Sequence, residues 1–175
     1  MESQGTYLLI TLISNTSLLY EPLVLIPLIV AQYELKGHAT RTEHWSLVAL
    51  TSSSQSYTFE VRGNTDSFTY VAGPIAVPLN KILTYRGGCH VGDIPMDSLS
   101  QLPEMLREIP IVRQDLSWDC QTWVILATKL LKSAGFVFAQ VDEPYVREQL
   151  LEDMARWEEA ENTVDERLLA SGGEN

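Results

Sequence analysis

The chain of 175 residues has only two cysteines, Cys89 and Cys120, and three histidines. Two cysteines cannot form the disulfide framework of a small secreted protein, and neither lies in a spacing typical of zinc ligands. The histidines, His38, His44 and His90, are scattered along the sequence. The sequence therefore predicts no metal site and no cofactor, and it favours the cytoplasm as the compartment.

Positive charge is also scarce, with 12 Lys and Arg against 23 Asp and Glu and a formal net charge of −11. No basic stripe is present, which argues against nucleic acid as a partner. The acidic residues are unevenly placed, because residues 142–175 contain eleven of them and only three arginines. Most of the negative charge therefore belongs to a C-terminal element.

The sequence has one long apolar stretch, residues 7–31. Glu21, Pro22 and Pro27 interrupt it, which argues against a membrane-spanning helix. The start, Met1-Glu2-Ser3, lacks the positive charge of a secretion signal. We expect buried strands over 7–13 and 23–30, and membrane contact through residues 7–31 is the less favoured alternative.

The length suits a single domain over residues 1–175. The pattern predicts an α+β fold in which an antiparallel sheet packs against a helix that carries a cysteine at its N-terminus. Further strands are expected over 67–71, 79–85 and, as a strand or a return segment, 136–139, with turns at 73–74 and 86–88. Helices are expected over 97–107, 119–134 and 144–169, the last of them acidic and amphipathic.

His44 begins a strand that ends near Leu50, and a second strand runs from Tyr57 to Gly63. A turn-forming segment separates them, so they are expected to form an antiparallel hairpin. A three-residue loop would place Glu60 opposite His44, and a five-residue loop would place it diagonally across the same face. Glu60 is therefore a candidate to orient the imidazole of His44, provided that the loop has an odd length.

Cys120 stands where an amphipathic helix is expected to begin, with Asp119 or Ser117 as the N-cap. Apolar residues recur at three- and four-residue spacing after it, which predicts that the thiol shares the buried face. The partial positive charge of a helix N-terminus stabilises a thiolate and lowers the pKa of a thiol. Cys120 is therefore a candidate nucleophile, with His44 as its base.

These residues resemble a known group. The His44-Trp45 strand start and the Asp119-Cys120-Gln121-Thr122-Trp123-Val124 helix start are similar to motifs of the lecithin:retinol acyltransferase-like group, within the permuted papain-like, NlpC/P60-type superfamily. That group has a second histidine where this chain has Glu60, and Asn-Cys-Glu-His-Phe-Val at the helix start. The similarity covers roughly residues 44–134.

The resemblance implies a circularly permuted papain-like core over about residues 44–138 and catalysis by Cys120, His44 and Glu60. The expected activity is that of a hydrolase or acyltransferase, acting on an ester, thioester or amide of a small-molecule, lipid or peptide substrate through an acyl-enzyme. The backbone N–H of Cys120 and the amide of Gln121 are candidate donors to the oxyanion. The alternative is a catalytically inactive, papain-like binding or regulatory module.

Cys89-His90 offers a competing dyad in a glycine-rich segment. Neighbouring residues of an extended chain point to opposite sides, which makes direct proton transfer between them awkward. The pair is therefore the weaker candidate.

Overall fold

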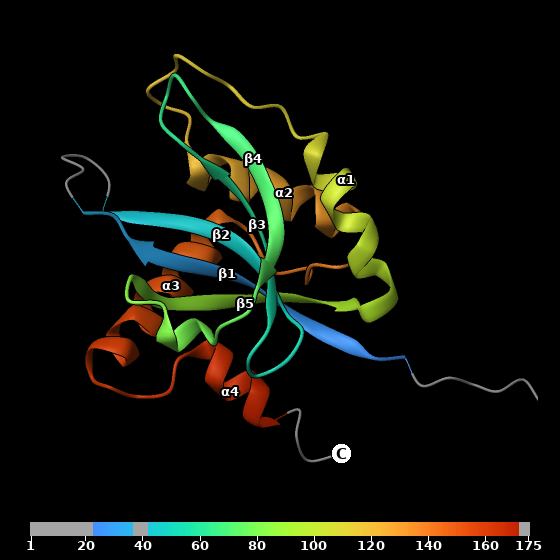
Figure 1. Ribbon diagram of the computed structural model, residues 1–175, viewed down its shortest axis with the longest axis vertical. Helices are drawn as coiled ribbons and strands as arrows, with labels where there is room; N and C mark the ends of the chain where they lie inside the picture. The colour runs from blue at the N-terminus through green and yellow to red at the C-terminus, as the bar shows by residue number, and fades with distance from the viewer. Residues whose placement is uncertain (1–22, 37–41, 172–175) are drawn as a thin grey trace, which may run out of the picture.

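The computed structural model describes residues 23–36 and 42–171. These residues form an α+β fold with a five-stranded antiparallel sheet in the order β4-β3-β2-β1-β5 (Figure 1). The strands are β1 (Leu25–Glu34), β2 (Glu43–Leu50), β3 (Ser56–Arg62), β4 (Thr69–Ile75) and β5 (Tyr85–Pro95). The helices are α1 (Leu102–Arg107), α2 (Cys120–Ser133), α3 (Glu143–Glu158) and α4 (Val164–Ser171), with 3₁₀ turns at Leu79–Lys81 and Met96–Gln101.

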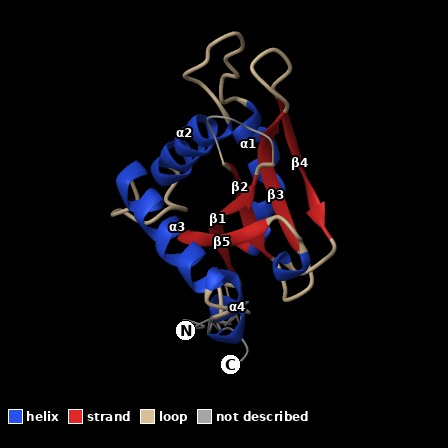
Figure 2. Ribbon diagram, turned by 90° about the vertical axis from the view of Figure 1, so that its left-hand side faces the viewer, coloured by secondary structure: helices blue, strands red, loops and turns tan. Residues whose placement is uncertain are grey.

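The sheet has an apolar cluster on each face. The larger cluster joins Trp45 and Leu47 of β2 to α1, α2 and α3, and Figure 2 shows α2 and α3 on one side of the strands. The smaller cluster joins Val48 and Leu50 of β2 to Val164 of α4. Alternate residues of β2 thus belong to different faces, as the period of two of a strand requires.

The expected hairpin is confirmed. β2 pairs with β3 from Leu47 opposite Phe59 to Leu50 opposite Ser56, which leaves a five-residue loop over residues 51–55. The expected helix with Cys120 at its start is also present, and Gly135 follows it with a φ of 82°, the left-handed conformation of a C-terminal cap. The strand expected over residues 7–13 lies outside the described residues.

Two predicted turns are wrong. Pro74 lies within β4 rather than in a turn. β4 tolerates this proline because it is an edge strand, where a residue without an N–H can be accommodated. Residues 86–88 lie within β5, which pairs with β1 and places Gly88 opposite Ala31. The strand predicted over 79–85 is instead a 3₁₀ turn that leads into β5. In both places the pairing with a neighbouring strand overrides the local preference of glycine and proline.

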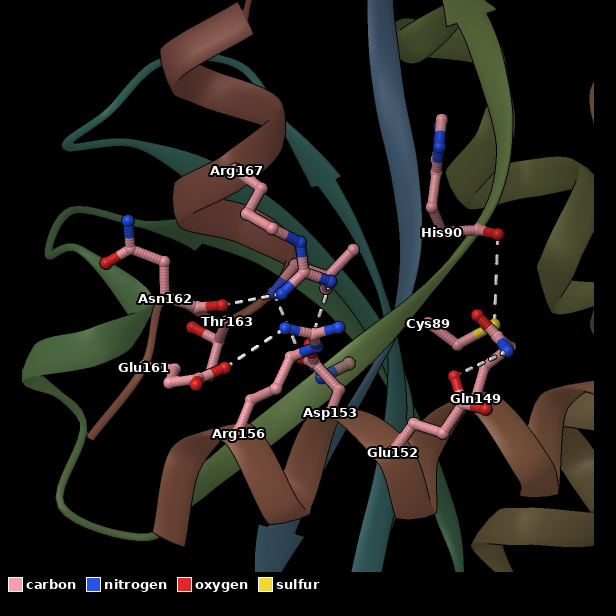
Figure 3. A network of polar contacts seen from close by, with 12 residues as sticks. Cys89, His90, Gln149, Glu152, Asp153, Arg156, Glu161, Asn162, Thr163 and Arg167 are labelled. Atoms are coloured by element: carbon pink, nitrogen blue, oxygen red, sulfur yellow. Dashed lines mark hydrogen bonds and ion pairs between the residues drawn. The ribbon is translucent and has the colours of Figure 1, made fainter. Parts of the chain in front are cut away.

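The long helix predicted over 144–169 is two helices. α3 ends at Glu158, Ala160 adopts a positive φ of 56°, and α4 begins at Val164. Asp153 of α3 is the reason for the reversal, because its carboxylate accepts hydrogen bonds from Val164 N (3.0 Å) and from Gly88 N of β5 (2.8 Å). Arg167 of α4 donates to the other oxygen at 3.0 Å (Figure 3). The buried carboxylate thereby fixes α4 to α3 and β5.

Residues 136–139 form a return segment rather than a strand, with Phe138 N donating to Val91 O at 2.9 Å. It passes so close to β5 that a Cβ on Gly92 would lie 1.9 Å from the carbonyl oxygen of Phe136. Only glycine fits at this position. Among the described residues, no helix is long and apolar enough to cross a membrane.

Candidate active site

His44 and Glu60 are brought together by the hairpin. The observed register, continued by one pair, sets Glu60 opposite Ser46 and diagonal to His44. Their side chains meet, with His44 Nε2 2.6 Å from Glu60 Oε2. The five-residue loop is thus one of the two odd lengths that permit this contact.

The two strands separate at this point. Beyond Leu47 and Phe59, β2 continues beside β1 to Glu43 and β3 continues beside β4 to Arg62. Figure 1 shows β3 rising away from β2 toward this end. His44 therefore lies past the β2–β3 pairing, where its side chain reaches the beginning of α2.

Cys120 is the first residue of α2 and is buried. Asp119 is the N-cap, because its Oδ1 accepts hydrogen bonds from Thr122 N at 2.9 Å and Thr122 Oγ1 at 3.1 Å. Trp123 and Val124 then pack into the larger core and orient the helix. The prediction that this helix starts at the cysteine and buries its apolar side is confirmed.

The imidazole of His44 is hydrogen-bonded to the side chain of Cys120 as well as to that of Glu60. Because Nε2 faces Glu60, Nδ1 is the ring nitrogen left for the thiol. Burial by itself would lower the pKa of His44, but the hydrogen bonds and negative charge of Cys120 and Glu60 raise it to about 9. The ring is therefore held in its charged form at neutral pH, beside the sulfur.

Arg62 is a third charged side chain at this site, bound to the carboxylate of Glu60. Its Nε and a terminal nitrogen donate to Glu60 Oε1 at 2.9 and 2.6 Å, while the other oxygen faces His44. Burial raises the pKa of Glu60, but the hydrogen bonds from His44 and Arg62 outweigh it and lower the pKa. Sequence reasoning missed Arg62, although its position two residues after Glu60 on the same strand face was the available signal.

Gln121 is directed at the protein rather than at the sulfur. Its Nε2 donates to the carbonyl oxygen of Glu43 at 3.3 Å, and its Oε1 accepts from Arg147 of α3 at 3.2 Å. The Arg147 guanidinium also lies 4.9 Å from the centre of the Trp45 ring. The geometry gives Gln121 a positioning contact, and no sequence signal pointed to Arg147.

Two pockets adjoin His44. One has a volume of about 310 Å³ and includes Cys120, Trp118 and Phe68 in its lining. The other, of about 480 Å³, includes Tyr33, Glu60 and Arg62. Both pockets therefore offer space for a substrate next to the imidazole.

The competing pair does not assemble. Cys89 is buried and its sulfur faces the carbonyl oxygen of His90 at 3.8 Å (Figure 3). His90 Nε2 lies 3.0 Å from Gly92 O and 3.1 Å from Asp93 Oδ1. Burial, reinforced by the charge of Asp153, raises the pKa of Cys89 to about 12. Cys89 is thus an unreactive thiol at neutral pH.

The described part of the chain contains no group of three or more His, Cys, Asp or Glu side chains arranged to hold a metal ion. Comparisons with protein-family models, with curated proteins and with solved structures each found no match.

Proposed function

We propose that this protein is a thiol-dependent hydrolase or acyltransferase with a circularly permuted papain-like fold. One observation carries the proposal: the imidazole of His44 is hydrogen-bonded to both Cys120 and Glu60. A thiol, a base and an acid that orients the base form the arrangement that activates a nucleophile. The histidine precedes the cysteine in the chain, which is the order of the permuted group.

His44 and the N-terminus of α2 both place positive charge near the sulfur and favour the thiolate. The thiolate attacks the carbonyl carbon of an ester, thioester or amide. A carbon–sulfur bond forms while an electron pair of the carbonyl moves to its oxygen. The backbone N–H of Cys120, at the start of α2, is the donor we assign to this oxyanion.

When the carbonyl re-forms, the bond to the leaving oxygen, sulfur or nitrogen breaks, and His44 gives its proton to that atom. Water, or an alcohol or amine acceptor, then loses a proton to His44 and attacks the thioester of Cys120. The carbon–sulfur bond then breaks as the carbonyl re-forms, and Cys120 is released as the thiolate beside the charged His44, together with an acid or a transferred acyl product. Glu60 keeps the ring in one tautomer and stabilises its charged form throughout.

The experiment that tests the proposal is alkylation of the native protein with iodoacetamide over a range of pH, read out by mass spectrometry of each cysteine. We expect Cys120 to react at about pH 6, well below the range of an ordinary thiol. His44→Ala should shift this reactivity to higher pH. Cys89 is the internal control, because burial raises its pKa to about 12 and it lines neither pocket beside His44, so it should react only after unfolding.

If iodoacetamide does not alkylate Cys120 up to about pH 9, the proposed enzymatic activity is wrong, and the catalytically inactive binding or regulatory module is the remaining function. Cys89 and Cys120 are both present as thiols, which agrees with a reducing compartment, so the proposal includes the cytoplasm as the location.

A further inference from the structure

The 310 Å³ pocket beside Cys120 lies between the start of α2 and two loops. Residues 63–68 form the connection from β3 to β4, and residues 112–118 lead into α2. His44 and Cys120 both contribute to its lining, so a group bound in this pocket touches the proposed reacting atoms. The pocket is therefore placed to hold one side of a substrate carbonyl.

The walls of this pocket are mainly apolar. The apolar side chains are Leu35, Val61, Phe68, Leu116 and Trp118. Neither Lys nor Arg occurs among the described residues that line it, and its carboxylate, Asp119, faces the N–H of Thr122 through Oδ1. His44 is the cation of this lining, but its charge is already engaged by Glu60 and Cys120, and Asp119 stands in the same wall. A ligand with a negative charge would thus be desolvated here beside a carboxylate, at a cost in binding free energy. The lining selects an uncharged group.

The two loops are joined to each other, so the pocket exists before a ligand binds. Arg113 donates to the carbonyl oxygen of Phe68 at 3.2 and 2.8 Å, and Gln114 N donates to Thr65 O at 2.8 Å. The rings of Phe68 and Trp118 pack edge to face with their centres 5.2 Å apart. A preformed wall of aromatic edges and faces complements another aromatic ring.

Leu116 stands at this pocket with 88% of its surface exposed. Its side chain has little packing of its own to lose, and a bound apolar group would cover it. This residue offers a way to change the pocket without disturbing the core.

The volume limits the size of the group. At roughly 30 Å³ for each non-hydrogen atom, the share of a water molecule in the liquid, 310 Å³ accommodates about ten such atoms. This lies at the lower end of the range of ligand pockets, which is about 300–1,000 Å³. A long alkyl chain does not fit within it, whereas an arylacetyl group does.

We propose that this pocket binds the acyl group of the substrate, and that this group is compact, uncharged and aromatic. The assignment rests on the proposed role of Cys120 as nucleophile. It excludes long-chain lipid acyl groups and anionic acyl groups as preferred substrates.

The test uses four p-nitrophenyl esters that share one leaving group: the acetate, the phenylacetate, the laurate and the hemisuccinate. Release of p-nitrophenolate gives kcat/KM, and each value is divided by the rate of the same ester with glutathione. We expect the phenylacetate to exceed the acetate by about tenfold from burial of the ring, with the laurate and hemisuccinate below it. A laurate or hemisuccinate that is the best substrate, or equal values for all four, would overturn the proposal.

Leu116→Asp should remove the advantage of the phenylacetate over the acetate. Leu83→Asp is the matched control, because Leu83 is 92% exposed and lines neither pocket beside His44. Equal effects of the two substitutions would contradict the assignment of the pocket.

A second measurement separates the pocket from the chemistry. Phenylacetamide binding to the Cys120→Ala protein, followed by saturation-transfer NMR, does not require a nucleophile. Binding that Leu116→Asp abolishes, together with no turnover of any ester, would overturn the thiol chemistry and support the pocket. An absence of binding would overturn the pocket whether or not the esters are hydrolysed.

Discussion

Gln121 donates a hydrogen bond from Nε2 to the carbonyl oxygen of Glu43 at 3.3 Å. The residue that follows the proposed nucleophile is thus held to the residue that precedes the proposed base. Arg147 of α3 holds the other end of the same amide at 3.2 Å. α2, β2 and α3 are therefore connected at one side chain, next to both Cys120 and His44.

Gln121→Leu keeps the approximate volume of the side chain and removes both contacts. A hydrogen bond of this kind contributes about 1 kcal/mol, so we expect the rate of Cys120 alkylation at about pH 6 to fall roughly three- to tenfold. Gln149→Leu is the control, because the Gln149 amide donates to the neighbouring Glu152 on α3 and Gln149 lines neither pocket beside His44. A Gln121→Leu protein with the rate and pH profile of the wild type would show that the contact does not position the site.

Glu60→Gln tests the electrostatics of the pair. The negative charge of Glu60 helps to raise the pKa of His44 to about 9, so its removal should lower that pKa. The charged imidazole would then be lost at a lower pH. We expect the alkaline limit of the pH window of activity to move to lower pH.

The NMR titration of the His44 ring, assigned by its absence in His44→Ala, provides the direct measurement for Glu60→Gln. The wild-type ring should titrate near pH 9 and the Glu60→Gln ring clearly below it. An unchanged titration would mean that Glu60 does not act on His44.

Asp153→Ala should destabilise the fold rather than the chemistry. The substitution leaves the N–H groups of Gly88 and Val164 without their acceptor and the Arg167 guanidinium without its anion. Removing one partner from a buried charged network costs about 3 kcal/mol or more. Urea unfolding measures this loss, and Glu152→Ala, an exposed neighbour on α3, should change the free energy of unfolding by less than about 0.5 kcal/mol.

Gly92→Ala should also lower stability, because the added Cβ would lie 1.9 Å from the carbonyl oxygen of Phe136. The return segment would have to move away from β5, at a cost of about 2 kcal/mol or more. Gly73→Ala is the matched control in β4, where a Cβ would meet nothing within 4 Å. Equal midpoints of thermal unfolding for the two variants would contradict this account of the packing.

Local sequence patterns gave correct predictions for single helices and for strands joined by a short loop. The alternation of residues in β2 and β3 predicted that Glu60 meets His44, and the cap and apolar spacing predicted a helix that begins at Cys120. The turn predicted over residues 86–88 was wrong, because glycine favours a turn locally, whereas β5 is determined by its pairing with β1. The division of the C-terminal helix into α3 and α4 was missed for the same reason, since it depends on hydrogen bonds between Asp153 and residues of β5 and α4.

The sequence by itself determined the candidate residues: a thiol at a helix start, an imidazole at a strand start and a carboxylate in register with it. Only the tertiary structure decided that the imidazole meets the thiol. By alternation His44 belongs with Val48 and Leu50, on the face away from α2, and it reaches Cys120 because β2 and β3 separate past Leu47 and Phe59. The contacts of Gln121 with Arg147 and the pocket beside Trp118 depend likewise on segments far apart in the chain, which no local pattern specifies.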